Sequence, residues 1–81
     1  MELHDLLEKL KNRFVDVDAF GDNDEELSPI FMKNIDSITN KKDCDNLIKN
    51  IYDYDLFYSC NEEIQQTGIL DIISDIKNLL L

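Results

Sequence analysis

Cysteine and histidine are scarce in this chain of 81 residues, which contains two cysteines and one histidine. Cys44 and Cys60 form no Cys-x-x-Cys pair, and His4 has no cysteine, serine or second histidine near it in the sequence. Structural zinc sites need such ligands in closely spaced pairs, so we expect no metal site of this kind. We interpret both cysteines as small buried hydrophobic residues and His4 as a surface or boundary residue.

Long apolar runs and a basic N-terminal stretch are also missing. No segment approaches the length that crosses a membrane, so we expect no membrane insertion. The first residues, with Glu2, His4 and Asp5, do not resemble the basic start of a secretory signal. We therefore expect a cytoplasmic protein whose thiols are reduced.

Basic residues are too few to balance the acidic ones: 8 Lys and Arg face 18 Asp and Glu, for a net charge of −10. Such a charge repels nucleic acid and anionic membranes, so we expect partners with basic patches and binding that weakens with salt. One domain, residues 1–81, is all that this length allows, and it cannot easily enclose both a core and a deep dry active site. These points favour a monomeric carrier or binding protein over an enzyme.

Apolar residues at helical spacing predict amphipathic helices at both ends of the chain, over residues 3–14 and 69–80. Between them, Gly21 and Pro29 interrupt the polar stretch 15–35, which we interpret as a long loop held to the core by its apolar residues. No useful β alternation is present.

A second helix is expected to start near Ser37, with its apolar face formed by Cys44, Leu47, Ile48, Ile51 and Tyr52. Leu56 and Phe57 are expected to anchor the following segment in the core. A short helix over residues 61–66 would end at Thr67 and Gly68. The fold class predicted is therefore an all-α bundle of three main helices and one short helix.

The segment Ile35-Asp36-Ser37-Ile38 would place a serine where the long loop passes into that second helix. A helix N-terminus offers unpaired N–H groups and a partial positive charge, so it tolerates an attached phosphodiester. Asp36 would then be placed to bind a modifying enzyme or its metal. The simpler alternative is that Asp36 or Ser37 only caps the helix.

On these residues the chain resembles the acyl carrier protein family, including its peptidyl and D-alanyl carriers. An Asp-Ser-Ile motif lies near the middle of the chain, as in that family, after a long stretch that follows the first helix. Further similar segments are Leu27-Ser28-Pro29-Ile30-Phe31, Leu47-Ile48, the stretch 52–56, Glu62-Glu63-Ile64 and the stretch 69–80.

The resemblance implies an acyl-carrier-like four-helix bundle in which Ser37 receives 4′-phosphopantetheine from coenzyme A, with Asp36 and Ile38 beside it. Implied partners are a phosphopantetheinyl transferase and enzymes that load or accept acyl or aminoacyl thioesters. Leu47, Ile51, Ile64 and Ile73 would line a cleft that shelters the cargo. Asn34 stands where the family has a glycine, and Asn can supply the same left-handed backbone.

Lys41 and Lys42 interrupt the acidic docking surface that the family presents on its second helix. They point to a specialised pathway, such as polyketide or nonribosomal peptide synthesis, rather than to ordinary fatty-acid synthesis.

The alternative function is a small acidic inhibitor, of the immunity-protein or antitoxin type, that blocks a basic toxin enzyme. It explains the acidic run 22–26 without any role for Ser37. Asp16, Asp18 and Gly21 hint at a calcium loop, but Phe20 and Leu27 occupy ligand positions, so we reject an EF-hand. Four aromatic residues, Tyr52, Tyr54, Phe57 and Tyr58, are interpreted as core.

Overall fold

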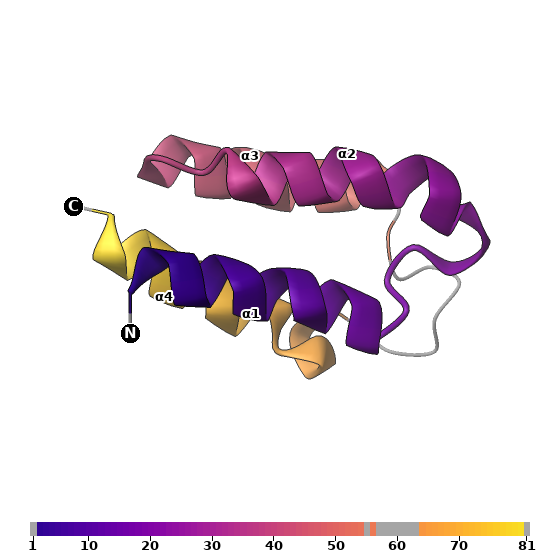
Figure 1. The fold of residues 1–81 in the computed structure, drawn as a ribbon, viewed down its shortest axis with the longest axis horizontal. Coiled ribbons are helices and arrows are strands. Elements are labelled where there is room, and N and C mark those ends of the chain that lie inside the picture. Colours follow the sequence, from indigo (N-terminus) through magenta and orange to yellow (C-terminus); the bar gives the residue numbers. More distant parts are fainter. Residues whose placement is uncertain (1, 55, 57–63, 81) are drawn as a thin grey trace.

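The computed structural model describes residues 2–54, 56 and 64–80. These residues form four α-helices, α1 (Leu3–Asp16), α2 (Asp24–Asp36), α3 (Lys41–Asp53) and α4 (Ile69–Leu79), and two short 3-10 helices, η1 (Gly21–Asn23) and η2 (Ile64–Thr67). Successive helices run in opposite directions, with α1 beside α4 and α2 beside α3 (Figure 1). The predicted all-α class is confirmed for the described part of the chain, which contains no strand.

The helices expected at the two ends of the chain are confirmed. Both α1 and α4 turn one apolar face inward, and Leu10, Phe14, Ile69 and Ile76 on those faces are fully buried. Gly68 precedes α4 with φ +80°, a left-handed conformation that suits glycine. The Ile69 N–H donates a hydrogen bond to the Thr67 hydroxyl at 3.2 Å. The helix break that we expected at Thr67 and Gly68 is therefore observed. None of the described helices is long and apolar enough to cross a membrane.

The long loop predicted for residues 15–35 is wrong. Most of this stretch is α2, and the connection from α1 is short because η1 occupies part of it. Fully buried Phe31 and Ile35, one turn apart, fix α2 to the core. Burying two such side chains contributes about 1.5–3 kcal/mol each. Asn34 lies inside α2, so it does not supply the left-handed turn that we expected there.

Pro29 lies inside α2 and does not end the helix. Pro29 is in the second turn of the helix, where it removes the bond that its N–H would make to the carbonyl of Glu25 and its ring crowds that carbonyl. Three acidic side chains, Asp24, Glu25 and Glu26, occupy the first turn, where the helix dipole favours negative charge. The burial of Phe31 and Ile35 and this favourable placement of charge together outweigh the cost of the proline.

The helix expected to open near Ser37 begins instead at Lys41. Asn40 is its N-cap and accepts a bond from the Asp43 N–H at 3.0 Å. The Asp43 carboxylate in turn accepts bonds from the N–H and hydroxyl of Thr39 at 2.9 and 3.0 Å. This reciprocal pairing is a form of capping box, and it sets the start of α3 four residues later than the sequence analysis placed it.

Four aromatic rings lie under the end of the bundle where α1 joins α2. Phe14 and Phe20 are stacked with centroids 5.6 Å apart, and Phe31 packs against both at 6.0 and 5.6 Å. Tyr54, just after α3, meets Phe31 edge to face at 5.6 Å. The cluster joins α1, α2, the connection between them and the end of α3 into one rigid unit.

Several predictions about single residues are now decided. Cys44 and Leu56 are buried and His4 is exposed, as expected. Tyr52 and Tyr54 are 57% and 48% exposed, so their assignment to the core is wrong. Leu47, Ile51 and Ile73 are buried core residues. Phe57, Tyr58, Cys60, the segment 61–63 and the side chain of Ile64 lie outside the described residues.

Candidate functional site

Asp36 is the last residue of α2, and its carboxylate faces α1. The Lys11 ammonium of α1 donates to it at 2.7 Å and pairs also with Glu8 at 2.8 Å. The bond to Asp36 is the main cause that raises the pKa of Lys11, with Glu8 second. Asp36 therefore joins two helices on the surface, a structural contact that the sequence analysis did not foresee.

Ser37 closes α2 rather than opening α3, so the position predicted for it is wrong. Its N–H bonds to the carbonyls of Lys33 and Asn34 at 3.1 and 3.2 Å, and its hydroxyl donates to the Lys33 carbonyl at 2.8 Å. The side chain is exposed. It stands at the negative end of a helix dipole, where an attached phosphodiester would be repelled rather than stabilised. The surroundings of Ser37 therefore do not fit a phosphopantetheine group in the way the resemblance implied.

Ile38 is a core residue. It is 3% exposed, and its N–H bonds to the carbonyl of Ile35 at 3.2 Å. It holds the connection between α2 and α3 against the bundle and is not available on the surface beside Ser37.

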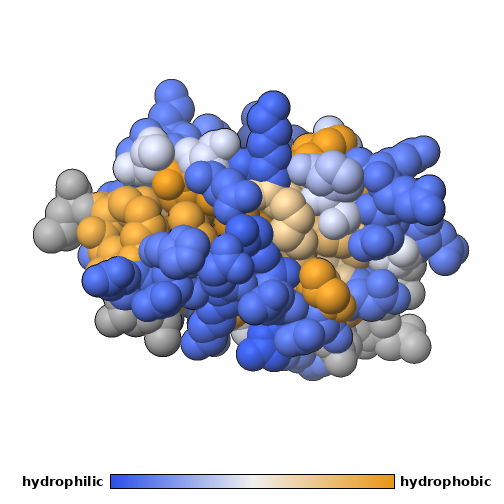
Figure 2. Space-filling model, viewed as in Figure 1, coloured by the Kyte–Doolittle hydropathy of each residue, from blue (hydrophilic) through white to orange (hydrophobic). Residues whose placement is uncertain are grey.

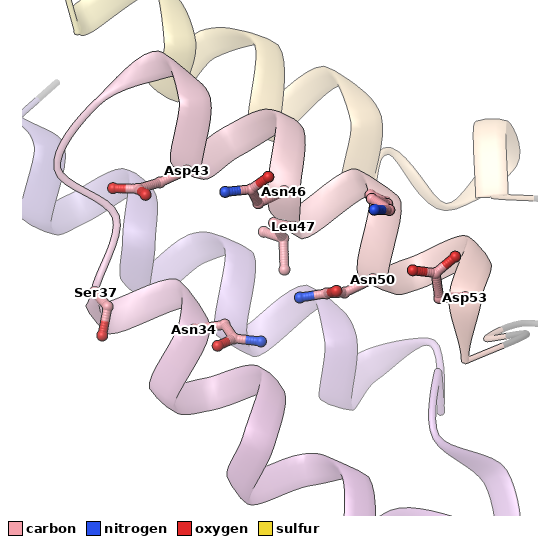
Figure 3. A pocket seen from close by; sticks show the side chains of 8 residues that line it. Asn34, Ser37, Asp43, Asn46, Leu47, Asn50 and Asp53 are labelled. Carbon is pink, nitrogen blue, oxygen red and sulfur yellow. The ribbon is translucent and has the colours of Figure 1, made fainter.

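A polar groove of about 370 Å³ lies between α2 and α3, and Ser37 lies at one end of it. We call this the α2–α3 groove. Asp43 is near the same end, and its carboxylate accepts hydrogen bonds from the backbone N–H of Thr39 and from the Thr39 hydroxyl, which lower the pKa of the Asp43 carboxyl. Figure 3 shows Asn34 of α2 and Ser37, which directly follows that helix, on one side of the groove and side chains of α3 on the other. The lining residues are Asn34, Ser37, Asp43, Asn46, Leu47, Lys49, Asn50 and Asp53.

The opposite end of the groove leads to the part of the bundle where α1 joins α2. The end of α1, η1, the start of α2 and the end of α3 lie together here (Figure 1), and these segments carry exposed carboxylates. The surface on the right of Figure 2 is mostly hydrophilic. We call this region the acidic end. Its carboxylates belong to Asp16, Asp18, Asp22, Asp24, Glu25, Glu26 and Asp53.

Arg13, in the last turn of α1, is the basic residue that precedes these carboxylates in the chain. No lysine or arginine occurs between Phe14 and Met32 in the sequence. Lys11 pairs with Glu8 and Asp36, and Lys77 pairs with Asp45 at 2.8 Å. Lys41 and Lys42 begin α3 at the other end of the bundle. The charge of the described chain is therefore unevenly distributed along its long axis.

Two exposed tyrosines stand at the acidic end. Tyr52 is in the last turn of α3 and Tyr54 directly follows that helix. Contact with the Phe31 ring holds Tyr54 in place although nearly half of it is exposed. Tyrosines of this kind are common anchors in protein interfaces, because they bury a large area at a low cost in side-chain entropy.

Metal binding has no support in the described residues, among which no group of three or more His, Cys, Asp or Glu is arranged around one point. Cys44 is buried against the core, and burial is the main cause that raises the pKa of its thiol. A thiol of this kind is a poor nucleophile and a structural residue.

Comparison with protein-family models, with curated proteins and with solved structures finds no match to this chain. Its function must therefore be argued from its own surface.

Sequence reasoning missed the tyrosines and the groove for different reasons. The pattern Tyr52-Asp53-Tyr54 alternates aromatic and acidic residues, which is unusual for a core and could have indicated a surface. The groove gave no such signal, because it depends on which face of α3 meets α2.

Proposed function

We propose that this protein binds and blocks a basic protein partner, as a small acidic inhibitor of the immunity-protein or antitoxin type does. The observation that carries the proposal is the pair of exposed tyrosines, Tyr52 and Tyr54, on an end of the bundle surrounded by carboxylates. An apolar or aromatic centre with a charged rim is the usual anatomy of a protein interface. The carboxylates would steer a basic partner to this end, and the tyrosines would supply affinity after contact.

Simple solubility explains only part of this arrangement. Asp24, Glu25 and Glu26 also favour the N-terminus of α2, so their helix position accounts for them without a partner. No such structural role accounts for Tyr52, which is more than half exposed. An exposed tyrosine beside acidic residues is better explained by a partner that covers it.

The test starts by capturing partners on the immobilised chain from an extract of the cells that encode it. The captured protein is then purified, and its binding is measured by titration calorimetry against the wild type and Tyr52→Ala. Leu79→Ala is the matched control, because Leu79 is a similarly exposed apolar residue at the other end of the bundle. The enzymatic or toxic activity of the partner is measured with and without the chain.

We expect a basic partner, one-to-one binding and an affinity that falls steeply with salt. Tyr52→Ala should weaken binding by about 10-fold or more, since interface hot spots typically cost more than 1 kcal/mol when truncated. Leu79→Ala should bind as the wild type does. A partner that binds Tyr52→Ala equally well, or that stays fully active in the complex, would contradict the proposal.

A second candidate is the acyl carrier function, with 4′-phosphopantetheine on Ser37 and acyl or aminoacyl thioesters as cargo. The exposure of the Ser37 hydroxyl favours it, because a transferase could reach that atom. It ranks second because Ser37 ends a helix and lies beside the Asp36 carboxylate. The test is the intact mass after incubation with coenzyme A, Mg²⁺ and a broad-specificity phosphopantetheinyl transferase. A gain of one phosphopantetheine unit, absent in Ser37→Ala, would establish a carrier and displace the inhibitor proposal.

A further inference from the structure

The α2–α3 groove is the least explained polar surface of the described chain. Three carboxamides line it, from Asn34 on α2 and from Asn46 and Asn50 on α3. Figure 3 shows the side chains of Asn34 and Asn50 pointing toward one another from the two helices. The side-chain hydrogen bonds at this groove involve Ser37 and Asp43, at the end near the α2–α3 connection. The carboxamides are left to meet solvent or a ligand.

A carboxamide offers one acceptor and a two-proton donor side by side, which matches the N–H and C=O of one residue in an extended chain, because these two groups point to the same edge. Nucleic acid and other polyanions do not suit the groove, because Asp43 and Asp53 stand near its ends and Lys49 is its one lining cation. An apolar ligand does not suit it either, since Leu47 is its one apolar lining residue and is almost fully buried.

The spacing along α3 favours an extended chain. Asn46 and Asn50 are four residues apart on one helix face, which is about 6 Å along the axis. In an extended polypeptide the residues whose N–H and C=O face one edge recur every two positions, or about 6.6 Å. One carboxamide can therefore meet the N–H and C=O of each successive residue along that edge. The third, on Asn34, approaches from the opposite wall.

We propose that the α2–α3 groove binds an extended peptide segment with basic side chains, read through its backbone by Asn34, Asn46 and Asn50. Asp53, exposed where the groove meets the acidic end, pairs with a lysine or arginine of the segment. This inference rests on the proposed function and deepens it: the basic partner inserts an extended arm or loop, rather than a helix, beside the tyrosines.

The probe is a blocked nine-residue peptide, acetyl-Lys-Thr-Arg-Thr-Lys-Thr-Arg-Thr-Lys-amide, titrated into the isotope-labelled full chain at low salt. Side-chain amide signals in the NMR spectrum report on each asparagine separately. A second peptide of the same sequence carries N-methyl groups on alternate peptide nitrogens, which keeps its charge but removes the N–H groups of one edge. A third carries them on the other nitrogens, so each edge is tested.

We expect the signals of Asn34, Asn46 and Asn50 to shift with the unmodified peptide, and one of the two methylated peptides to bind about 10-fold more weakly. The double variant Asn46→Ala/Asn50→Ala should bind the unmodified peptide more weakly by a similar factor. Asn12→Ala and Asn78→Ala are matched controls, because both remove an exposed helical asparagine outside the groove and should bind normally. Unfolding by urea checks that all variants remain folded.

Equal binding of all three peptides, or unchanged binding by the double variant, would overturn the inference, because charge alone would then account for the affinity. Absence of any shift in the three carboxamides would also overturn it. These failures are distinguishable from failure of the proposed function. A basic partner that still depends on Tyr52 would leave the inhibitor proposal standing and exclude only the groove.

Discussion

Replacing Pro29 by alanine tests whether α2 exists, and with it the position of Ser37. Pro29 is exposed in the second turn of α2 and lacks the N–H that would bond to the Glu25 carbonyl. Proline inside a helix costs about 3 kcal/mol relative to alanine. Loss of the proline also raises the conformational entropy of the unfolded chain, which lowers the free energy of unfolding by about 0.4–1 kcal/mol. Because Pro29 is close to the helix start and already accommodated, we expect Pro29→Ala to stabilise the protein by about 1–2 kcal/mol.

The measurement is urea unfolding followed by circular dichroism, together with thermal unfolding. For a chain of this size, 1 kcal/mol corresponds to a change of about 4–8 °C in the melting temperature. Asn12→Ala in α1 is the control for the helix propensity of alanine alone and should gain only about 0.5 kcal/mol. If residues 24–36 were a loop, Pro29→Ala would instead destabilise the protein by about 0.4–1 kcal/mol. That opposite sign would refute α2.

Three further predictions concern the residues around Ser37 and α3. Asp43→Asn should be less stable than the wild type near pH 7. The folded pKa of Asp43 lies below its ordinary value, so the ionised carboxylate stabilises the fold above about pH 4, and this stabilisation fades as the pH falls. Urea midpoints measured from pH 7 to 2.5 should converge at the acid end, and a constant difference would contradict this. Cys44 should react with a thiol reagent only as fast as the protein unfolds, so rapid labelling in native buffer would show that it is not buried. Ser37→Ala should change the free energy of unfolding by less than about 1 kcal/mol, because only one exposed bond to Lys33 is lost; a larger loss in urea would mean that Ser37 has a tighter structural role.

The sequence predicted α1 and α4 well because their apolar residues recur without interruption. In α2 the same signal was present, since Leu27, Phe31 and Ile35 are spaced four residues apart. Pro29 and the acidic run predicted a loop instead, although acidic residues are also favoured at a helix start. Tertiary burial of Phe31 and Ile35 decided the outcome.

The start of α3 was also available in the sequence, as Asn40 followed three residues later by Asp43. The interpretation of Asp36-Ser37 as a helix start conflicts with this cap. The α2–α3 groove could not have been predicted in this way. It arises because α2 and α3 leave polar side chains of both helices facing one another, and helix packing is not encoded by any short motif.

The alternation of helix direction also places the start of α1 and the end of α4 together, at the end of the bundle away from the acidic end (Figure 1). An affinity tag or surface tether at that end therefore leaves the tyrosines and the acidic end accessible to a partner. Two copies joined by a short flexible linker there could each keep an uncovered acidic end. Such a tandem would bind a multivalent basic target with an avidity set by the linker length, without any change to the binding surface itself.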